Sequence, residues 1–177
     1  GDIFTPEFFD LLKSISDDVF FLPGVDRAQV KSIFTPNVRY TEVVEDGIAG
    51  GNVIPDDFRP VPEGFARVKE NILKAGIVGR LIANDFSGAI VSAQLMEFHP
   101  NTGERIDYVE VAHMLEEEIR AKYDKKDVND QYDIHITGFS KVIGDIADGV
   151  TRVRFLFGVT FRIMPCLFYC VTLLFKL

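Results

Sequence analysis

The residues that could carry out chemistry are few and scattered along this sequence. Three histidines are predicted to lie in a turn, a helix and a strand, respectively: His99, His113 and His135. No two of them have the i, i+4 spacing of a helical metal site. The adjacent carboxylates Asp17–Asp18 and Asp56–Asp57 could work as acid and base, but no nucleophile lies beside either pair in the sequence. We interpret both pairs as solvated surface residues.

Phosphate binding and nucleophilic catalysis also lack their usual motifs. The glycine-containing segment 74–80 does not match the Gly-x4-Gly-Lys-Ser/Thr pattern, so we interpret Gly76 and Gly79 as turn glycines that end a helix. No serine lies in a Gly-x-Ser-x-Gly elbow. The acidic run Glu116, Glu117 and Glu118 is interpreted as a solvated helix face. The sequence therefore predicts a protein that is not an enzyme and that uses neither a metal nor a cofactor.

Charge is divided unevenly between the body of the chain and its C-terminal tail. Of the 177 residues, 19 are basic and 27 acidic, which gives a net charge of −8. The tail, residues 150–177, has four basic residues and no acidic one: Arg152, Arg154, Arg162 and Lys176. The other 149 residues have 15 basic and 27 acidic side chains, a net charge of −12. A nucleic-acid-binding protein needs a basic face, so the acidic body argues against that class.

The tail is also the most apolar part of the chain. From Phe155 to Phe175, 16 of 21 residues are apolar and Arg162 is the only charged one, which predicts a transmembrane helix in which neighbouring helices compensate for Pro165. Over residues 151–163 the apolar residues instead recur at every second position, which predicts a half-buried strand. Both alternatives remain open. The two cysteines, Cys166 and Cys170, lie here and are expected to be inert thiols.

The body is predicted to alternate helices with strands. Helical spacing and end signals predict four helices, at residues 6–21, 63–74, 108–123 and 141–147. Strands are predicted at residues 25–34, 38–44, 88–98 and 134–139, and loops at residues 45–64 and 122–133. Two strands in direct succession indicate an α+β fold with helices on one face of a mixed or antiparallel sheet. Ferredoxin-like (split βαβ) units are the natural candidate.

Three stretches of the sequence resemble the RND (resistance-nodulation-division) superfamily of exporters, on its MMPL-like side. The first is Ile3-Phe-Thr-Pro-Glu-Phe-Phe-Asp-Leu-Leu, followed by Leu22-Pro-Gly-Val-Asp and Val30-Lys-Ser-Ile-Phe-Thr-Pro-Asn. The second is Leu81-Ile-Ala-Asn-Asp-Phe-Ser-Gly-Ala-Ile-Val-Ser, and the third is Gly138-Phe-Ser-Lys-Val-Ile-Gly-Asp. They occur in the family's order over nearly the whole chain. The tail departs from the family pattern in its arginines, Pro165 and two cysteines.

The resemblance implies that residues 1–149 are a periplasmic porter-type domain and that residues 150–177 begin the second membrane helix. It further implies a proton-driven exporter of hydrophobic or lipid-like substrates, in the bacterial inner membrane. The implied partners are the remaining transporter helices, a second porter loop and other copies of the protein. The family's proton-relay acids lie in later membrane helices, and the family's first porter strand precedes the part that this chain resembles. We interpret Gly1, at which the chain begins, as a cloning remnant or an internal boundary of a longer protein. The resemblance therefore implies that this chain takes part in efflux only within the complete transporter and cannot transport by itself.

The sequence also allows a second hypothesis, a stand-alone periplasmic or cytoplasmic α+β module that binds a small ligand or a partner. In that case the tail would be an interface strand. If residues of the body contact an exported substrate, we expect them in the glycine-rich and proline-rich loop from Gly47 to Pro62. The apolar faces of the strand from Gly88 to Phe98 are the second candidate. An ordinary loop and a core strand remain the simpler interpretation of both segments.

Overall fold

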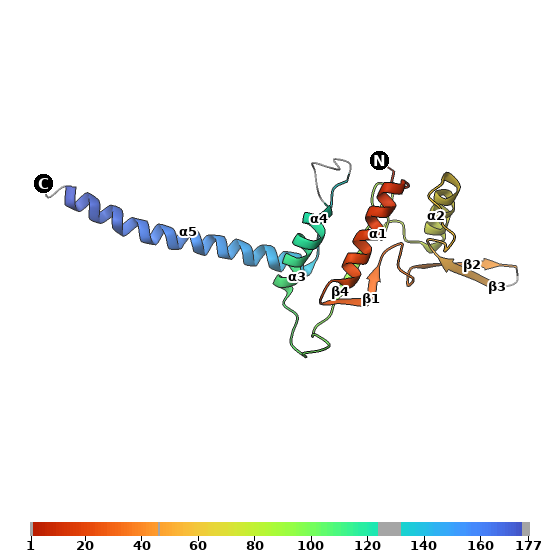
Figure 1. Cartoon of the computed structure of the whole chain (residues 1–177), viewed down its shortest axis with the longest axis horizontal. Helices are drawn as coiled ribbons and strands as arrows, with labels where there is room; N and C mark the ends of the chain where they lie inside the picture. The colour runs from red at the N-terminus through yellow and green to blue at the C-terminus, as the bar shows by residue number, and fades with distance from the viewer. Residues whose placement is uncertain (1, 46, 124–131, 175–177) are drawn as a thin grey trace. The chain divides into compact units, whose positions relative to one another are not determined.

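The chain folds as an α+β protein that divides into two compact units (Figure 1). The computed structural model describes residues 2–45, 47–123 and 132–174, and side chains as far as residue 164. The first unit comprises Gly1–Ile106 and Glu116–Ile134, and the second comprises Asp107–Leu115 and His135–Leu177. This division differs from the predicted boundary at residue 149, because α3 (Tyr108–Met114) packs with α5 (Phe139–Leu174) in the second unit.

Two short antiparallel sheets lie in the first unit. Strand β1 (Val25–Lys31) pairs with β4 (Ser92–Leu95), with Val25 opposite Leu95. Strand β2 (Arg39–Val44) forms a hairpin with β3 (Gly47–Asn52), in which Arg39 lies opposite Asn52. The α+β prediction is thus confirmed at the level of class. Among the described residues the strands form two separate two-stranded sheets.

Two helices of the first unit have the ends that their sequences predict. Helix α1 (Pro6–Phe21) begins after Thr5, whose hydroxyl accepts a hydrogen bond of 3.3 Å from the Phe8 amide. Its first residue is Pro6. Proline suits this position because the N–H that it lacks would have no acceptor within the helix there. Helix α2 (Pro62–Ala75) ends at Gly76, which adopts the left-handed conformation with φ 62°.

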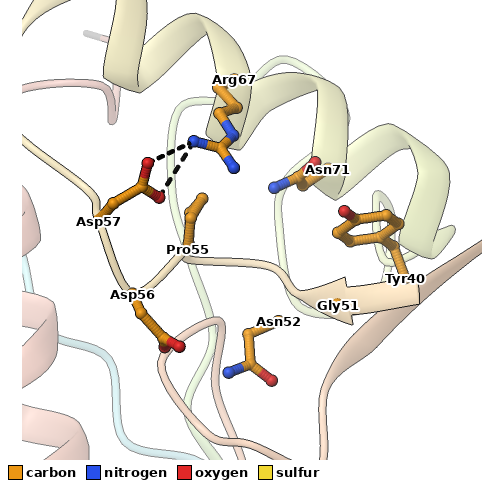
Figure 2. Close-up of a pocket in the computed structure, with 8 residues that line it drawn as sticks. All are labelled: Tyr40, Gly51, Asn52, Pro55, Asp56, Asp57, Arg67 and Asn71. Atoms are coloured by element: carbon orange, nitrogen blue, oxygen red, sulfur yellow. Dashed lines mark hydrogen bonds and ion pairs between the residues drawn. The ribbon is translucent and has the colours of Figure 1, made fainter. Parts of the chain in front are cut away.

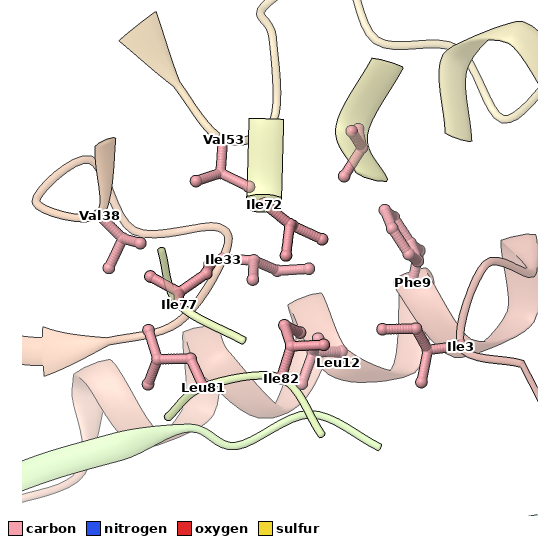
Figure 3. Packing of buried hydrophobic residues seen from close by; sticks show 11 residues of the cluster. Ile3, Phe9, Leu12, Ile33, Val38, Val53, Ile72, Ile77, Leu81 and Ile82 are labelled. Carbon is pink, nitrogen blue, oxygen red and sulfur yellow. The ribbon is translucent and has the colours of Figure 1, made fainter. Parts of the chain in front are cut away.

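The core lies between these helices and the irregular segments beside them (Figure 3). Val68 and Ile72 of α2 are fully buried, and Phe9 and Leu12 of α1 face them. The segment 77–82, although irregular, contributes further members of the cluster. The remaining core residues are Ile3, Ile33, Val38, Val53, Ile77, Leu81 and Ile82. Strands β2 and β3 contribute no buried residue, so the helices and loops provide most of the apolar burial.

The second unit is a packed pair of helices. The Asp107 carboxylate caps α3 by accepting a 2.8 Å hydrogen bond from the Val109 amide. Its helical path continues through the π-helix η1 (Leu115–Arg120) and the short α4 (Ala121–Tyr123), which confirms that the segment 108–123 is helical. Gly144 of α5 lies so close to α3 that a Cβ there would be 2.5 Å from the Ala112 methyl group.

Four predictions of secondary structure are corrected by the structure. Residues 47–52, expected to be loop, form β3, because two residues between two extended segments suffice for a hairpin. The strand expected at residues 88–98 is reduced to Ser92–Leu95. No strand forms at residues 134–139, where the chain is irregular until α5 begins at Phe139. The short helix expected at residues 141–147 is the start of the 36-residue α5. Most of the predicted loop at 122–133 lies outside the described residues.

The tail is helical in the structure as far as Leu174, so the strand alternative for residues 151–163 is wrong. In the described ranges 2–45, 47–123 and 132–174, no helix is both long and apolar enough to span a bilayer. The predicted membrane segment ends at Phe175, and residues 175–177 lie outside the described residues.

Candidate functional site

A shallow pocket with a volume of about 400 Å³ lies between β3, the segment that follows it and α2 (Figure 2). Part of its lining comes from the loop from Gly47 to Pro62, in which we predicted contacts with a substrate. Eight residues line the pocket: Tyr40, Gly51, Asn52, Pro55, Asp56, Asp57, Arg67 and Asn71. Six of the eight have polar side chains, so the pocket suits a polar ligand better than a hydrophobic one.

The hairpin of β2 and β3 forms one wall of the pocket, and Gly51 in this hairpin leaves room for the Tyr40 ring. Gly51 lies opposite Tyr40, and a Cβ at Gly51 would be 3.2 Å from the phenol oxygen of Tyr40. Glycine therefore lets the tyrosine ring lie close against β3. The sequence shows Gly50 and Gly51 plainly, but their role depends on the cross-strand partner, which the sequence does not show.

Lys74 holds the hairpin to α2. Its Nζ lies 2.8 Å from a Glu42 carboxylate oxygen on β2 and 2.9 Å from a Glu70 carboxylate oxygen on α2. The ammonium group also lies 5.9 Å from the centroid of the Tyr40 ring. The hydrogen bonds that Lys74 donates to Glu42 and Glu70 raise the pKa of Lys74, so this lysine stays charged over the whole physiological range.

The opposite wall contains an ion pair between Asp57 and Arg67. The guanidinium Nη1 of Arg67 donates to both carboxylate oxygens of Asp57 at 3.0 Å. The hydrogen bond and the charge of Arg67 lower the pKa of Asp57. Asp57 is thus ionised at neutral pH and is unsuited to the role of a general acid. Buried Asn71, one turn further along α2, donates a 3.0 Å hydrogen bond to the Val53 carbonyl.

Asp56 differs from its neighbour Asp57 in having no partner among the described residues. Within the part of the chain that the structure describes, its carboxylate makes no hydrogen bond or ion pair. The lining contains no serine, cysteine or histidine that could act as a nucleophile or as a base near neutral pH. The geometry therefore permits hydrogen bonding to a polar molecule and offers no catalytic pair.

We expect the Asp57–Arg67 ion pair to stabilise the protein only above acidic pH. The pKa of Asp57 is lowered from its ordinary value of 3.8, so the stabilisation is present above that value and is lost as the pH falls through the lower pKa of the folded state. At pH 7, Asp57→Asn should lower Tm by at most about 4 °C, because both side chains are largely exposed. Thermal unfolding from pH 7 to pH 2.5 should show this difference disappearing below about pH 4.

Asp56→Asn is the matched control for that experiment, since Asp56 lies beside Asp57 and has no partner among the described residues. It should leave Tm unchanged at every pH. A pH-independent difference between Asp57→Asn and the native chain would contradict the role of the ion pair.

The other acidic pair is also structural. Asp17 pairs with Lys13 at 3.6 Å, and Asp18 accepts hydrogen bonds from Lys122 at 2.5 Å and Tyr123 at 2.6 Å. Partial burial acts to raise the pKa of Asp18, but these two hydrogen bonds together outweigh it and the pKa is lowered. The prediction of solvated surface residues is confirmed for Asp17, Asp56 and Asp57, which are exposed, and is wrong for Asp18, which is half-buried.

The three histidines considered as possible metal ligands, His99, His113 and His135, do not form a metal site among the described residues. The main chain of His99 forms a turn with Glu104 and Gly103, and His135 is exposed in the segment before α5. In the second unit, the Nε2 of His113 lies 3.1 Å from a carboxylate oxygen of Asp148. Among the described residues, no group of three or more acidic, histidine or cysteine side chains is arranged to hold a metal ion.

The acidic run on η1 is only partly solvated. Glu117 and Glu118 are exposed, whereas Glu116 is half-buried and accepts a 2.6 Å hydrogen bond from Arg120. Arg120 also donates to the Ile134 carbonyl at 2.9 Å, so the pair ties the π-helix to the chain that leads toward α5. The prediction of a solvated face is thus wrong for Glu116.

The second predicted contact segment does not form an apolar strand face. Ile90 and Phe98 lie outside β4 and are largely exposed, and Val91 packs against the core. Arg105 lies over the Phe98 ring, 5.7 Å from its centroid. This segment therefore offers separate apolar side chains and no continuous apolar surface.

A second candidate surface lies on α5. We call residues 150–164 the exposed α5 segment, because its large apolar side chains are all 39% or more exposed. These are Val150, Val153, Phe155, Leu156, Phe157, Val159, Phe161, Ile163 and Met164. Successive residues of an α-helix are 100° apart, so these side chains spread over about two thirds of the helix circumference. The remaining third contains Thr151, Arg154, Gly158 and Arg162. Sequence composition identified this surface correctly, whereas the pocket became visible only in the structure.

Comparisons of the chain with protein-family models, curated proteins and solved structures give no match.

Proposed function

We propose that this chain is a porter-domain segment of a proton-driven, MMPL-like exporter of the RND superfamily, acting on hydrophobic or lipid-like substrates. In this proposal the chain is not an enzyme and has no cofactor. The body faces the periplasm, the tail lies in the bacterial inner membrane among the other transporter helices, and the exporter works as a homo-oligomer with a second porter loop.

The exposed α5 segment is the observation that carries the proposal. An apolar surface over most of the circumference of a helix is costly in water, and such helices are normally enclosed by a membrane or by other helices. The segment contains three arginines and no acidic residue. Its helix begins at Phe139, within the stretch that resembles the entry to the family's second membrane helix.

The arrangement of the strands supports the finer fold that we propose, a ferredoxin-like porter sheet. β1 and β4 pair although β2, β3 and α2 lie between them in the chain. Split βαβ units pair strands that are not consecutive. We propose that further strands of the complete exporter extend this pair.

Fractionation of cells that express the full-length protein tests the proposal. We expect the protein in the membrane fraction, resistant to alkaline carbonate and released only by detergent. For topology, Cys166 and Cys170 would be replaced by alanine and the exposed Glu104 by cysteine, because residues 1–149 contain no other thiol. A maleimide that does not cross membranes should label Glu104→Cys in intact spheroplasts. Recovery of the full-length protein in the soluble fraction without detergent would contradict the proposal.

The polar pocket favours a second candidate function, a stand-alone periplasmic module that binds a small ligand. Its lining of hydrogen-bonding groups, with one unpaired carboxylate at Asp56, fits a polar ligand and does not fit a lipid. Soluble recovery in the same fractionation, together with intact folding, would favour this function over the exporter.

A further inference from the structure

Two arginines at the base of the exposed α5 segment, Arg152 and Arg154, have no partner among the described residues. Arg152 and Arg154 are exposed and, among the described residues, make no hydrogen bond and no ion pair. The nearest carboxylates along the helix are already engaged. Asp148 lies 3.1 Å from His113, and Asp145 accepts a hydrogen bond from Lys141. The two guanidinium groups are therefore available to an external anion.

The surroundings of these arginines restrict the kind of anion. On the C-terminal side follow the exposed side chains of Phe155, Leu156 and Phe157, of which Phe155 is 72% exposed. On the N-terminal side lies the acidic body. A partner that matches both features has an anionic layer directly beside an apolar one. The surface of a bilayer that contains anionic phospholipids has this arrangement.

The chemistry of arginine fits this partner. A guanidinium group binds phosphate oxygens through two parallel hydrogen bonds. Its long aliphatic part can lie against acyl chains while the charged end remains at the level of the headgroups. Exposed aromatic residues next to it are suited to the interface between headgroups and acyl chains.

Orientation signals do not explain these arginines. Basic residues that orient a membrane helix are enriched on its cytoplasmic side. In the proposed exporter the body faces the periplasm, so Arg152 and Arg154 lie at the other end of the helix. A role in binding lipid headgroups accounts for their position.

We propose that Arg152 and Arg154 bind the phosphate groups of anionic phospholipids on the body's side of the membrane, a site that rests on the proposed membrane location of α5. Each basic side chain near an anionic membrane surface increases the binding constant for that surface by about fivefold. The pair should therefore favour an anionic over a zwitterionic lipid by about five- to 25-fold.

Lipid-specific quenching of tryptophan fluorescence tests this site in the full chain, which contains no tryptophan of its own. Phe157→Trp, one helical turn beyond Arg154, places a single reporter on an exposed position. The full chain is reconstituted into bilayers of phosphatidylcholine and phosphatidylglycerol. Either lipid is brominated in its acyl chains, and the ratio of quenching gives the relative binding constant of the anionic lipid.

We expect a relative constant of about five or more for the chain with only Phe157→Trp, and a value near one after Arg152→Gln and Arg154→Gln are added. Arg39→Gln with Arg80→Gln is the charge-matched control, because these exposed arginines lie in the body and have no partner in the described part of the chain. The control should keep the high value.

If the relative binding constant of the anionic lipid is the same with and without Arg152 and Arg154, the lipid site is overturned. Strong quenching by both brominated lipids in that case would still support the membrane location of α5. A constant near one in the chain that keeps both arginines would also overturn the site. Absence of quenching by either brominated lipid would overturn the membrane location itself, and with it the site.

Discussion

Replacing Phe9 with alanine should destabilise the first unit by about 3–5 kcal/mol, the largest effect that we expect from a single substitution. Phe9 is 3% exposed and lies at the centre of a cluster of phenylalanine rings. Its ring centroid is 5.1 Å from that of Phe65 on α2 and 5.6 Å from that of Phe58. Further contacts reach Phe34 and Phe4 at 5.8 and 6.3 Å. Alanine would remove the ring that joins α1 to α2 and leave a cavity.

Native-state hydrogen exchange of the amides in α1 and α2 would measure this loss, because these helices should open together when their shared core is weakened. Phe21→Ala is the matched control on the same helix. Phe21 is 65% exposed, so its removal should change stability by less than about 1 kcal/mol. Similar exchange rates in Phe9→Ala and Phe21→Ala would show that the aromatic cluster does not hold the two helices together.

Sequence reasoning located α1 and α2 well because their signals are local. Thr5 and Pro6 start α1, and the Leu22-Pro23-Gly24 segment follows directly after its last residue. Gly76 ends α2 in the left-handed conformation that glycine adopts easily. These features depend on neighbours within a few positions, which the sequence displays directly.

The strands were predicted less well because their formation depends on distant partners. Residues 134–139 are rich in β-branched residues, yet no described strand pairs with them and they remain irregular. Conversely, the glycine-rich residues 47–52 have weak β propensity and form β3 because β2 lies two residues away. Cross-strand contacts outweigh intrinsic preference in both cases.

The pocket illustrates the same limit for functional residues. Glycine and proline correctly marked the loop from Gly47 to Pro62 as irregular over its second half. The Asp57–Arg67 ion pair joins that loop to the second turn of α2, ten residues further on, and only the fold brings the two side chains together. The same holds for Lys74, which reaches Glu42 across 32 positions.

In the tail, composition predicts that the residues are apolar but does not predict which contacts stabilise the helix that they form. Gly149 and Gly158 would be expected to weaken a helix, yet α5 continues through both positions. The packing of its first turns on α3 accounts for part of this continuity, because tertiary contacts stabilise helices more than propensity does. Gly144 contributes to this packing, because a side chain there would overlap Ala112 of α3.

Gly144→Ala should destabilise the second unit by about 1–3 kcal/mol, although alanine is the better helix former. Its Cβ would lie 2.5 Å from the methyl group of Ala112, a buried residue whose position is fixed by the backbone of α3. The helices must move apart to relieve this overlap. Hydrogen exchange of the α3 amides should accelerate by about five- to 150-fold, in proportion to the loss of stability.

Two controls separate this overlap from a general effect of substitution in α5. Gly149→Ala has open space around its Cβ and should stabilise the helix by about 1 kcal/mol. Ala112→Gly combined with Gly144→Ala exchanges the methyl group between the helices and should recover most of the lost stability, less about 1 kcal/mol for glycine in α3. If the exchanged pair is as unstable as Gly144→Ala alone, close packing of α3 on α5 is not the reason for glycine at position 144. Recovery would instead show that this contact fixes the base from which the exposed α5 segment extends.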